Sequence, residues 1–485
     1  MDTKITRNKE LSIYEALLPV IVLIVMLAYN VNVYGDEALS GSNQFILLMS
    51  GAVAAIVGFR NKVSYKAMME KVADNLRSTS SAIIILLLVG ALAGTWLISG
   101  IIPAMIYYGL KILNPTIFLP ATVIICSVIS IATGSSWTTS ATVGIALVGI
   151  GKTIGLPPGL VAGAVISGAY FGDKMSPLSD TTNLAPAMAG SDLFTHIRYM
   201  ALTTIPSILI TIIVFAVIGL TYNTSGTADS ESILTSIKES FNITGWVFIV
   251  PLVVIFLIVR KTEPLIALLI GTLLGAACAI VFQPQILLQI TKATELSFQT
   301  AYTGVMNAIT IDTAIETSNV ELNDLFSSGG MKGMMGTIWL IICAMVFGGV
   351  MEAIGALARI SQSLLKVATS IFGLFASTVA SCLALNVTAS DQYLAIVVPG
   401  KMFAKAYKDK GLAPENLSRT LEDSGTVTSA LVPWNTCGAY QSGVLGVAVG
   451  DYFMYAIFNY LSPIMTLIFA AFKIKIKMLS EKDKN

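Results

Sequence analysis

The chain has 485 residues, 55% of them hydrophobic and only 12% charged, and its formal net charge is +1. Soluble proteins carry about 25% charged residues, so this composition excludes a chain of hydrated soluble domains, and the near-zero net charge offers no field to attract nucleic acid. A single histidine excludes His-rich metal sites, and five widely spaced cysteines form no CxxC pair or disulfide framework. We therefore expect a polytopic membrane protein without a cofactor.

Apolar runs long enough to cross a bilayer recur along the chain. A helix needs about 20 such residues, and the runs that approach or reach this length are 12–29, 44–59, 80–99, 116–133, 200–220, 244–260, 264–283, 337–357, 371–388 and 452–472. Two further apolar stretches, 138–171 and 390–450, contain glycine, proline and acidic residues, which favour broken or re-entrant helices. The predicted fold is an all-α polytopic membrane protein with roughly 10–13 transmembrane helices, some of them broken, in two inverted repeats.

Basic residues between the apolar runs predict the orientation in the membrane. The loop 60–77 carries five basic residues and the tail after 472 carries five lysines, whereas 30–43 has no basic residue. Because cytoplasmic loops are enriched in lysine and arginine, both termini are predicted to be cytoplasmic. The expected location is the cell membrane, with lipid as a partner.

An internal repeat appears when the chain is shifted by 256 residues, which places 133–190 on 389–446 without a gap. Seven of these 58 positions are identical, and they include GLPP paired with GLAP and Pro177 paired with Pro433. The first GLPP has only Lys152 nearby, whereas five basic residues surround GLAP. Since the two equivalent loops are predicted to face opposite sides, the repeat is expected to be inverted, as in alternating-access transporters.

This pattern divides the chain into five expected regions. Two are ion-binding repeats, and the others are N-terminal helices, connecting helices, and a C-terminal helix with a basic tail. In chain order the regions are 1–78, 79–199 (first repeat), 200–334, 335–450 (second repeat) and 451–485.

The densest polar cluster in the apolar body is GDKMSPLSDTTN, at 172–183. Unpaired polar groups in lipid cost several kcal/mol each, and Pro177 frees backbone carbonyls from the helix. Carboxylates, hydroxyls and free carbonyls are the ligands that hard cations prefer. The cluster is therefore a predicted Na⁺ and H⁺ site, the alternative being a short surface loop, and its candidate ligands are Asp173, Ser176, Ser179, Asp180 and Thr181.

The second repeat supplies a chemically different set. Asn435 and Thr436 fall opposite Ser179 and Asp180, while Asp391 falls opposite Ser135. Each repeat thus brings an acid to a position where the other offers a hydroxyl. For Asp391 the alternative is a buried helix cap.

Lys174 and three weaker candidates complete the predicted site. Lys174 either anchors a substrate carboxylate or pairs with its neighbour Asp173, and sequence adjacency favours the pair. Asn386 precedes Asp391, Asp423 begins an apolar run where a helix N-terminus also favours an acid, and Glu352 lies in an otherwise apolar helix.

Three segments make the chain resemble the NhaC family of sodium/proton antiporters, within the ion-transporter superfamily: 134–144, 171–186 and 327–340. In that superfamily, Ser-Asn-Thr-like tips in both repeats hold sodium. The resemblance implies a similar role for 179–181 and 435–437, although an acid stands in the first triplet and the leading serine is missing from the second. The family includes members that resemble malate/sodium-lactate antiporters.

The predicted function is exchange of Na⁺ for H⁺ by alternating access, with the two ions competing for carboxylates at the membrane midplane. Desolvation there favours the protonated acid, and Na⁺ expels the proton. The alternative within the family is an organic-acid antiporter for malate and lactate. The chain contains no HExxH or GxSxG motif, which argues against an intramembrane enzyme. Two inverted halves are typical of transporters and fit a channel less well. Nucleic acid is not an expected partner, and a homodimer remains open.

Overall fold

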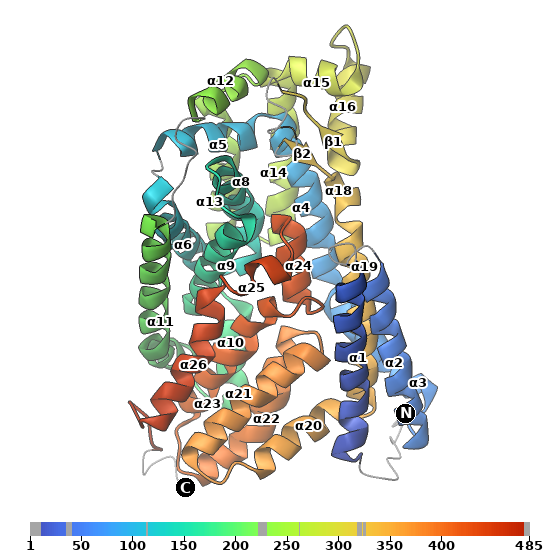
Figure 1. Cartoon of the computed structure of the whole chain (residues 1–485), viewed down its shortest axis with the longest axis vertical. Helices are drawn as coiled ribbons and strands as arrows, with labels where there is room; N and C mark the ends of the chain where they lie inside the picture. The colour runs from blue at the N-terminus through green and yellow to red at the C-terminus, as the bar shows by residue number, and fades with distance from the viewer. Residues whose placement is uncertain are drawn as a thin grey trace.

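The computed structural model describes residues 11–34, 41–112, 115–221, 230–260, 262–317, 323 and 326–479. These residues form an elongated helical body (Figure 1), and their only sheet pairs the two-residue strands β1 (Thr313–Ala314) and β2 (Ser327–Ser328). Judged by length and apolar composition, eight of the described helices could cross a membrane, and nine if the bent pair 233–240 and 245–258 is one span. The prediction of an all-α polytopic membrane protein with broken helices is confirmed.

The first repeat begins with α4 (Ser80–Ile98) and the short helix α5 (Ile101–Ile112). Its remaining elements are α6 (Pro115–Thr133), α7 (Ser136–Thr139), the π-helical segment η2 (Ser140–Gly144), α8 (Ile145–Thr153), α9 (Pro158–Met175), α10 (Asp180–Ala189) and α11 (Leu193–Thr221). A shift of 255 or 256 residues places this series on the second one, although the helices are divided at different points in the two series. The second series is α19 (Met335–Ala353), α20 (Ala356–Lys366), α21 (Ile371–Thr388), α22 (Gln392–Asp409), α23 (Pro414–Leu421), η5 (Glu422–Thr426), η6 (Val427–Leu431), α24 (Thr436–Leu445), α25 (Val449–Phe453) and α26 (Ile457–Ala471).

Backbone conformations repeat with the same shift. Glycines in the left-handed region end α10 and α24, at Gly190 and Gly446. Figure 1 places α5 near the upper end of the long axis and its counterpart α20 near the lower end, which is the arrangement that inversion requires.

Two prolines break equivalent helices. A residue that precedes proline is pushed out of the helical region, and Ser176 and Val432, which precede Pro177 and Pro433, both adopt extended backbone. New helices, α10 and α24, begin within four residues of each break. The sequence match at the prolines therefore marks the points where both halves interrupt a helix.

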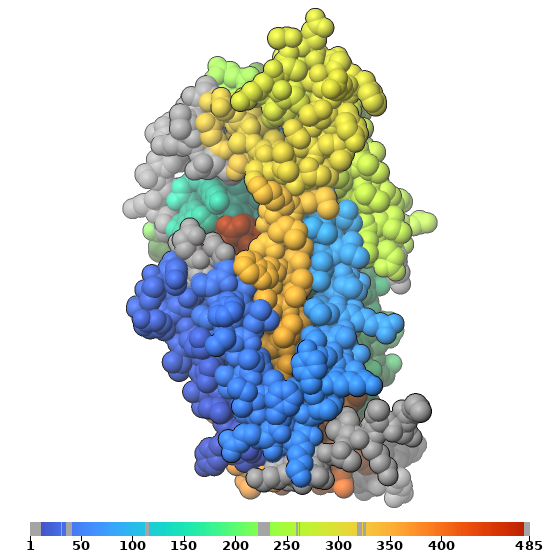
Figure 2. All heavy atoms as spheres, turned by 90° about the vertical axis from the view of Figure 1, so that its right-hand side faces the viewer, coloured from blue at the N-terminus to red at the C-terminus, as the bar shows by residue number. Residues whose placement is uncertain are grey.

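The other helices surround the repeats. Figure 2 shows α19 as an orange stripe between the darker blue of α1–α2 and the lighter blue of α3–α4. The predicted loop 60–77 is mostly helical, because α3 occupies it and packs on α19. The surrounding elements are α1 (Ile13–Tyr34), α2 (Ser42–Arg60), α3 (Tyr65–Ser78), α12 (Ser230–Ser240), η4 (Gly245–Phe248), α13 (Ile249–Val259), α14 (Pro264–Phe282), α15 (Pro284–Thr291), α16 (Phe298–Thr310) and α18 (Gly330–Gly333).

Close packing of α9 on α6 depends on small residues. A Cβ atom at Gly168 would lie 2.3 Å from the Val123 carbonyl oxygen, and one at Gly172 would lie 2.5 Å from that of Ser127. The Ser130 hydroxyl donates to the Ala169 carbonyl at 2.6 Å across the same interface. Small residues four apart allow this approach between membrane helices.

Replacing Gly168 with alanine should therefore destabilise the protein by about 1–3 kcal/mol, because the neighbouring backbone must move. The effect is measured by thermal unfolding in detergent, which is monitored through the loss of the monodisperse peak. Gly336→Ala is the matched control, since no atom lies within 4 Å of its added methyl group. Equal melting temperatures for the two variants would contradict this account of the interface.

Candidate functional site

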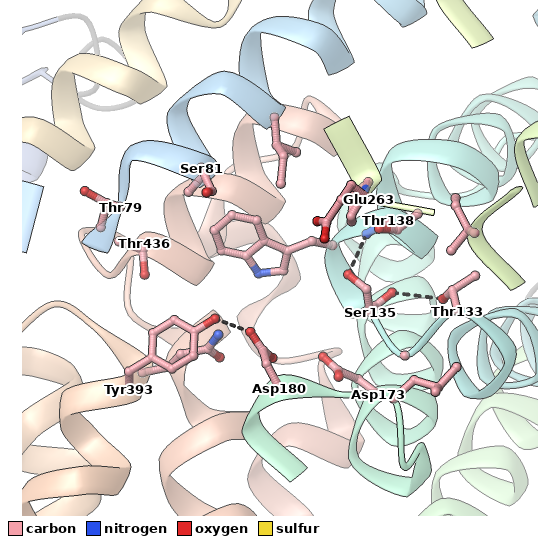
Figure 3. Close-up of a pocket in the computed structure, with 18 of the residues that line it drawn as sticks. Thr79, Ser81, Thr133, Ser135, Thr138, Asp173, Asp180, Glu263, Tyr393 and Thr436 are labelled. Atoms are coloured by element: carbon pink, nitrogen blue, oxygen red, sulfur yellow. Dashed lines mark hydrogen bonds between the residues drawn. The ribbon is translucent and has the colours of Figure 1, made fainter. Parts of the chain in front are cut away.

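A cavity of about 490 Å³ lies where the repeats meet the α3–α4 junction and the α13–α14 connection. Four of the predicted ligands line it: Asp173, Asp180, Asp391 and Thr436. Figure 3 shows Asp173 and Asp180 on one side, with Tyr393 and Thr436 reaching toward them from the second repeat. Tertiary structure thus brings acids from both repeats to one space.

Repeat counterparts line this cavity in pairs. A shift of 256 residues relates Ser135 to Asp391, Trp137 to Tyr393, and Asp180 to Thr436, and all six residues are in the lining. Because an inverted repeat has a pseudo-two-fold axis, residues that share a site with their own counterparts lie close to that axis. The cavity therefore lies close to the axis that relates the two repeats.

Asp173 lies in the last turn of α9 and is only 7% exposed. Its Oδ2 atom accepts hydrogen bonds from the Ser136 amide at 3.1 Å and the Ser136 hydroxyl at 2.7 Å. Its buried Oδ1 atom has no hydrogen-bond partner among the described residues. A carboxylate with one fixed and one free oxygen can accept a proton or a cation.

Asp180 is the first residue of α10, directly after the break at Pro177. Its Oδ1 atom accepts from the Thr181 amide at 2.8 Å, and its Oδ2 atom accepts from the Tyr393 hydroxyl. Both Asp173 and Asp391 lie within Coulombic range of Asp180. The Tyr393 contact joins the tip of the broken helix in one repeat to α22 in the other.

Asp391 caps a helix and also lies at the cavity, while its part in ion binding stays a prediction. Its Oδ1 atom accepts from the Leu394 amide at 3.0 Å and so caps α22. Its counterpart Ser135 caps α7 in the same way, through the Thr138 amide at 3.2 Å. The same Asp391 side chain also lines the cavity.

Three predicted hydroxyl ligands of the first repeat lie outside the cavity lining. Ser176 donates to the Ile131 carbonyl at 2.8 Å, Ser179 caps α10, and Thr181 donates to Glu422 at 3.1 Å. Their part in ion binding stays a prediction.

Two predicted amides of the second repeat bond to each other. The side-chain nitrogen of Asn435 lies 3.2 Å from Oδ1 of Asn386. Asn386 in turn donates to the Gly425 carbonyl at 2.8 Å and to the Thr428 hydroxyl at 3.0 Å. This buried pair supports the tip that presents Thr436 to the cavity.

The expected pairing of Lys174 with Asp173 is wrong. Lys174 is completely buried and forms an ion pair with Asp423, also completely buried, and its ammonium donates to Ser462 at 2.7 Å. Thr203 and Thr466 also donate to Asp423. Successive residues of a helix point about 100° apart, so Lys174 faces the protein interior while Asp173 faces the cavity.

Glu352 lies outside the cavity lining as well. It forms an ion pair with Lys71 of α3 at 2.8 Å. The hydrogen bond to Glu352 is the main reason that the pKa of Lys71 is raised above its ordinary value. Glu352 thus joins α19 to α3.

Sequence analysis missed several polar and aromatic residues of the site. Trp137 and Tyr393 line the cavity and are repeat counterparts, a relation that the 256-residue shift could have revealed. Glu263 reaches the lining from the start of α14, where an acid between two apolar runs was the available signal.

Several known proteins are similar to this chain in sequence. The sequence profile of the Na⁺/H⁺ antiporter family matches residues 168–474. The Na⁺/H⁺ antiporter NhaC of Alkalihalophilus pseudofirmus is 39% identical over 86% of this chain and 87% of its own. The malate-2H⁺/Na⁺-lactate antiporter of Bacillus subtilis is 38% identical over 89% and 88%, and the arginine/ornithine antiporter ArcD of Halobacterium salinarum is 34% identical over 97% and 94%.

The polytopic helical body, the acid-lined cavity between its repeats and these relatives together identify a membrane transporter. The chain belongs to the Na⁺/H⁺ antiporter family, and the resemblance to NhaC proteins that its motifs indicated is confirmed.

Replacing Lys174 with glutamine should destabilise the protein by about 3–5 kcal/mol, because it leaves Asp423 as a buried charge without its cation. Thermal unfolding in detergent measures the loss. The double variant Lys174→Gln/Asp423→Asn should recover most of it. Lys332→Gln is the control, since Lys332 pairs with Asp312 at an exposed site and such pairs contribute at most about 1 kcal/mol. A stable, fully folded Lys174→Gln protein would show that the buried pair is not needed.

Proposed function

We propose that this protein exchanges Na⁺ for H⁺ across the cell membrane by alternating access, at the cavity between its repeats. The observation that carries the proposal is the convergence of Asp173, Asp180 and Asp391 on one space with Thr436. Carboxylate and hydroxyl oxygens are the ligands of hard cations, and two of these acids come from one repeat and one from the other.

Na⁺ and H⁺ compete for the same carboxylates in this mechanism. Asp173 is the first candidate, because its Oδ1 atom is buried and has no described partner while Oδ2 is fixed by Ser136. A buried carboxylate without a counter-ion is costly, so either a proton or Na⁺ stabilises it. The protein changes sides only when the site is neutralised, and that condition produces antiport.

The broken helices supply the moving parts. We infer that the tips at α10 and α24 shift relative to the wall formed by the α3–α4 junction and the α13–α14 connection. The two ion-binding repeats, 79–199 and 335–450 in the proposed division, would then expose the cavity to one side at a time.

The positions of basic segments support cytoplasmic termini. Residues 477–479 of the basic tail bond to 411–413, next to the lysine-rich end of α22. In Figure 1 helices α3, α20 and α23 gather toward the same lower end. An excess of lysine and arginine at one end favours the cytoplasmic side.

Relatives of nearly equal identity carry names for different exchanges, so identity does not choose the cargo. A malate or lactate carrier needs a cation for the substrate carboxylate. Lys174, the residue that the sequence suggests for that role, is instead paired with Asp423, and none of the described lining residues is lysine or arginine. This lining favours a cation as cargo.

Asp180→Asn should reduce Na⁺-driven proton efflux by about tenfold or more, the loss expected when one charged ligand is removed. The measurement uses acid-loaded proteoliposomes with an internal pH dye, to which NaCl is added, with and without malate and lactate. Asp312→Asn is the control, since Asp312 is an exposed acid paired with Lys332 and neither residue lines the cavity.

Two results would overturn the proposal. Full efflux in Asp180→Asn and in Asp173→Asn would remove these acids from the mechanism. Efflux that requires malate or lactate would make the protein an organic-acid antiporter.

A further inference from the structure

The cavity is much larger than a sodium ion needs. Its volume of about 490 Å³ lies within the range of about 300–1,000 Å³ that is typical of sites for small organic molecules. The acids of its lining therefore surround a space of molecular size.

The charged side chains around that space are all acidic. Four acids line it, Asp173, Asp180, Asp391 and Glu263, and the described lining contains no basic side chain. Asp173, whose buried Oδ1 atom has no hydrogen-bond partner among the described residues, is one of these four. Figure 3 shows Glu263 on the side of the cavity opposite Tyr393, so negative charge is available at more than one wall.

Two aromatic rings add affinity for organic cations. Trp137 and Tyr393 line the cavity, and Trp137 is held in place by stacking on Tyr440, with ring centroids 3.9 Å apart and 17° between the planes. Ammonium and guanidinium groups bind to the faces of such rings, and the attraction is stronger when the cation has lost its water. A rigid indole next to carboxylates is a suitable surface for a flat or alkyl cation.

Groups that would hold a carboxylate are already used. Lys174 is paired with Asp423, and the N-termini of α10, α22 and α24 are capped by Ser179, Asp391 and Asn435. The lining residues that remain offer neutral donors, the amide of Gln392 and hydroxyls such as that of Thr436, and no cationic group.

We propose that the cavity also accepts an organic cation bearing an ammonium or guanidinium group, which the protein exchanges in place of Na⁺. This inference rests on the proposed Na⁺/H⁺ exchange at the same cavity. The acids of the repeats bind one cationic group, the rings of Trp137 and Tyr393 contact its carbon chain, and Glu263 contacts the far end of a dication. Both a diamine and a basic amino acid carry such a cationic group, but only the amino acid also carries a carboxylate.

The test uses the full-length protein in proteoliposomes with an internal pH dye. Agmatine, putrescine, arginine, the neutral analogue citrulline and the anion malate are each added, alone and against a series of Na⁺ concentrations. We expect agmatine and putrescine to drive proton efflux and to raise the Na⁺ concentration for half-maximal exchange, whereas citrulline and malate do neither. Arginine is included because it carries a carboxylate beside its guanidinium group, so comparing it with agmatine isolates the effect of that carboxylate.

Glu263→Gln separates the organic cation from Na⁺. The concentration of agmatine that halves Na⁺-driven efflux should rise about tenfold, as for the loss of one charge-assisted contact, and should rise more than the half-saturating Na⁺ concentration does. Glu70→Gln, at an exposed surface pair with Lys66, should change neither value. Na⁺-driven efflux that no organic cation competes with or replaces would overturn this inference while leaving the proposed function intact. Absence of Na⁺-driven efflux would overturn the proposed function instead.

Discussion

A bilayer offers no water to backbone N–H and C=O groups, so a helix can stop inside it only where protein or a lined cavity satisfies the freed groups. Pro177 and Pro433 interrupt two helices of the apolar body, and Ser176 and Val432 leave the helical region in front of them. The ends that follow are capped by Ser179 and Asn435. The cavity, the tips and the cross-repeat contacts all lie around these two interruptions.

The paired lining explains how a symmetric fold forms a chemically asymmetric site. The two members of a pair occupy equivalent positions but differ in chemistry. Asp391 occupies the position equivalent to Ser135, and Asp180 the position equivalent to Thr436. Duplicated backbone supplies the position, and the side chain decides whether that position carries a charge. The result is a lining with acids from both repeats.

The Lys174–Asp423 ion pair has two consequences. It fastens α9 to η5, with Ser462 and Thr466 of α26 and Thr203 of α11 completing its hydrogen bonds. It also removes the one lysine of the polar cluster from the cavity. A buried pair gains little net energy over apolar packing but is costly to break, so it fixes which side of α9 faces the cavity.

Sequence alone determined the membrane class, the positions of most spans, the family and the two proline breaks, because apolar length and proline act locally along the chain. The 256-residue shift also placed Asp391 and Thr436 opposite Ser135 and Asp180, four residues of one cavity. The partner of Lys174, the contact of Tyr393 with Asp180 and the presence of Glu263 in the lining were decided only by tertiary structure. These depend on which face each helix turns toward neighbours that are more than a hundred residues away, and adjacency in sequence, as for Asp173 and Lys174, does not carry that information.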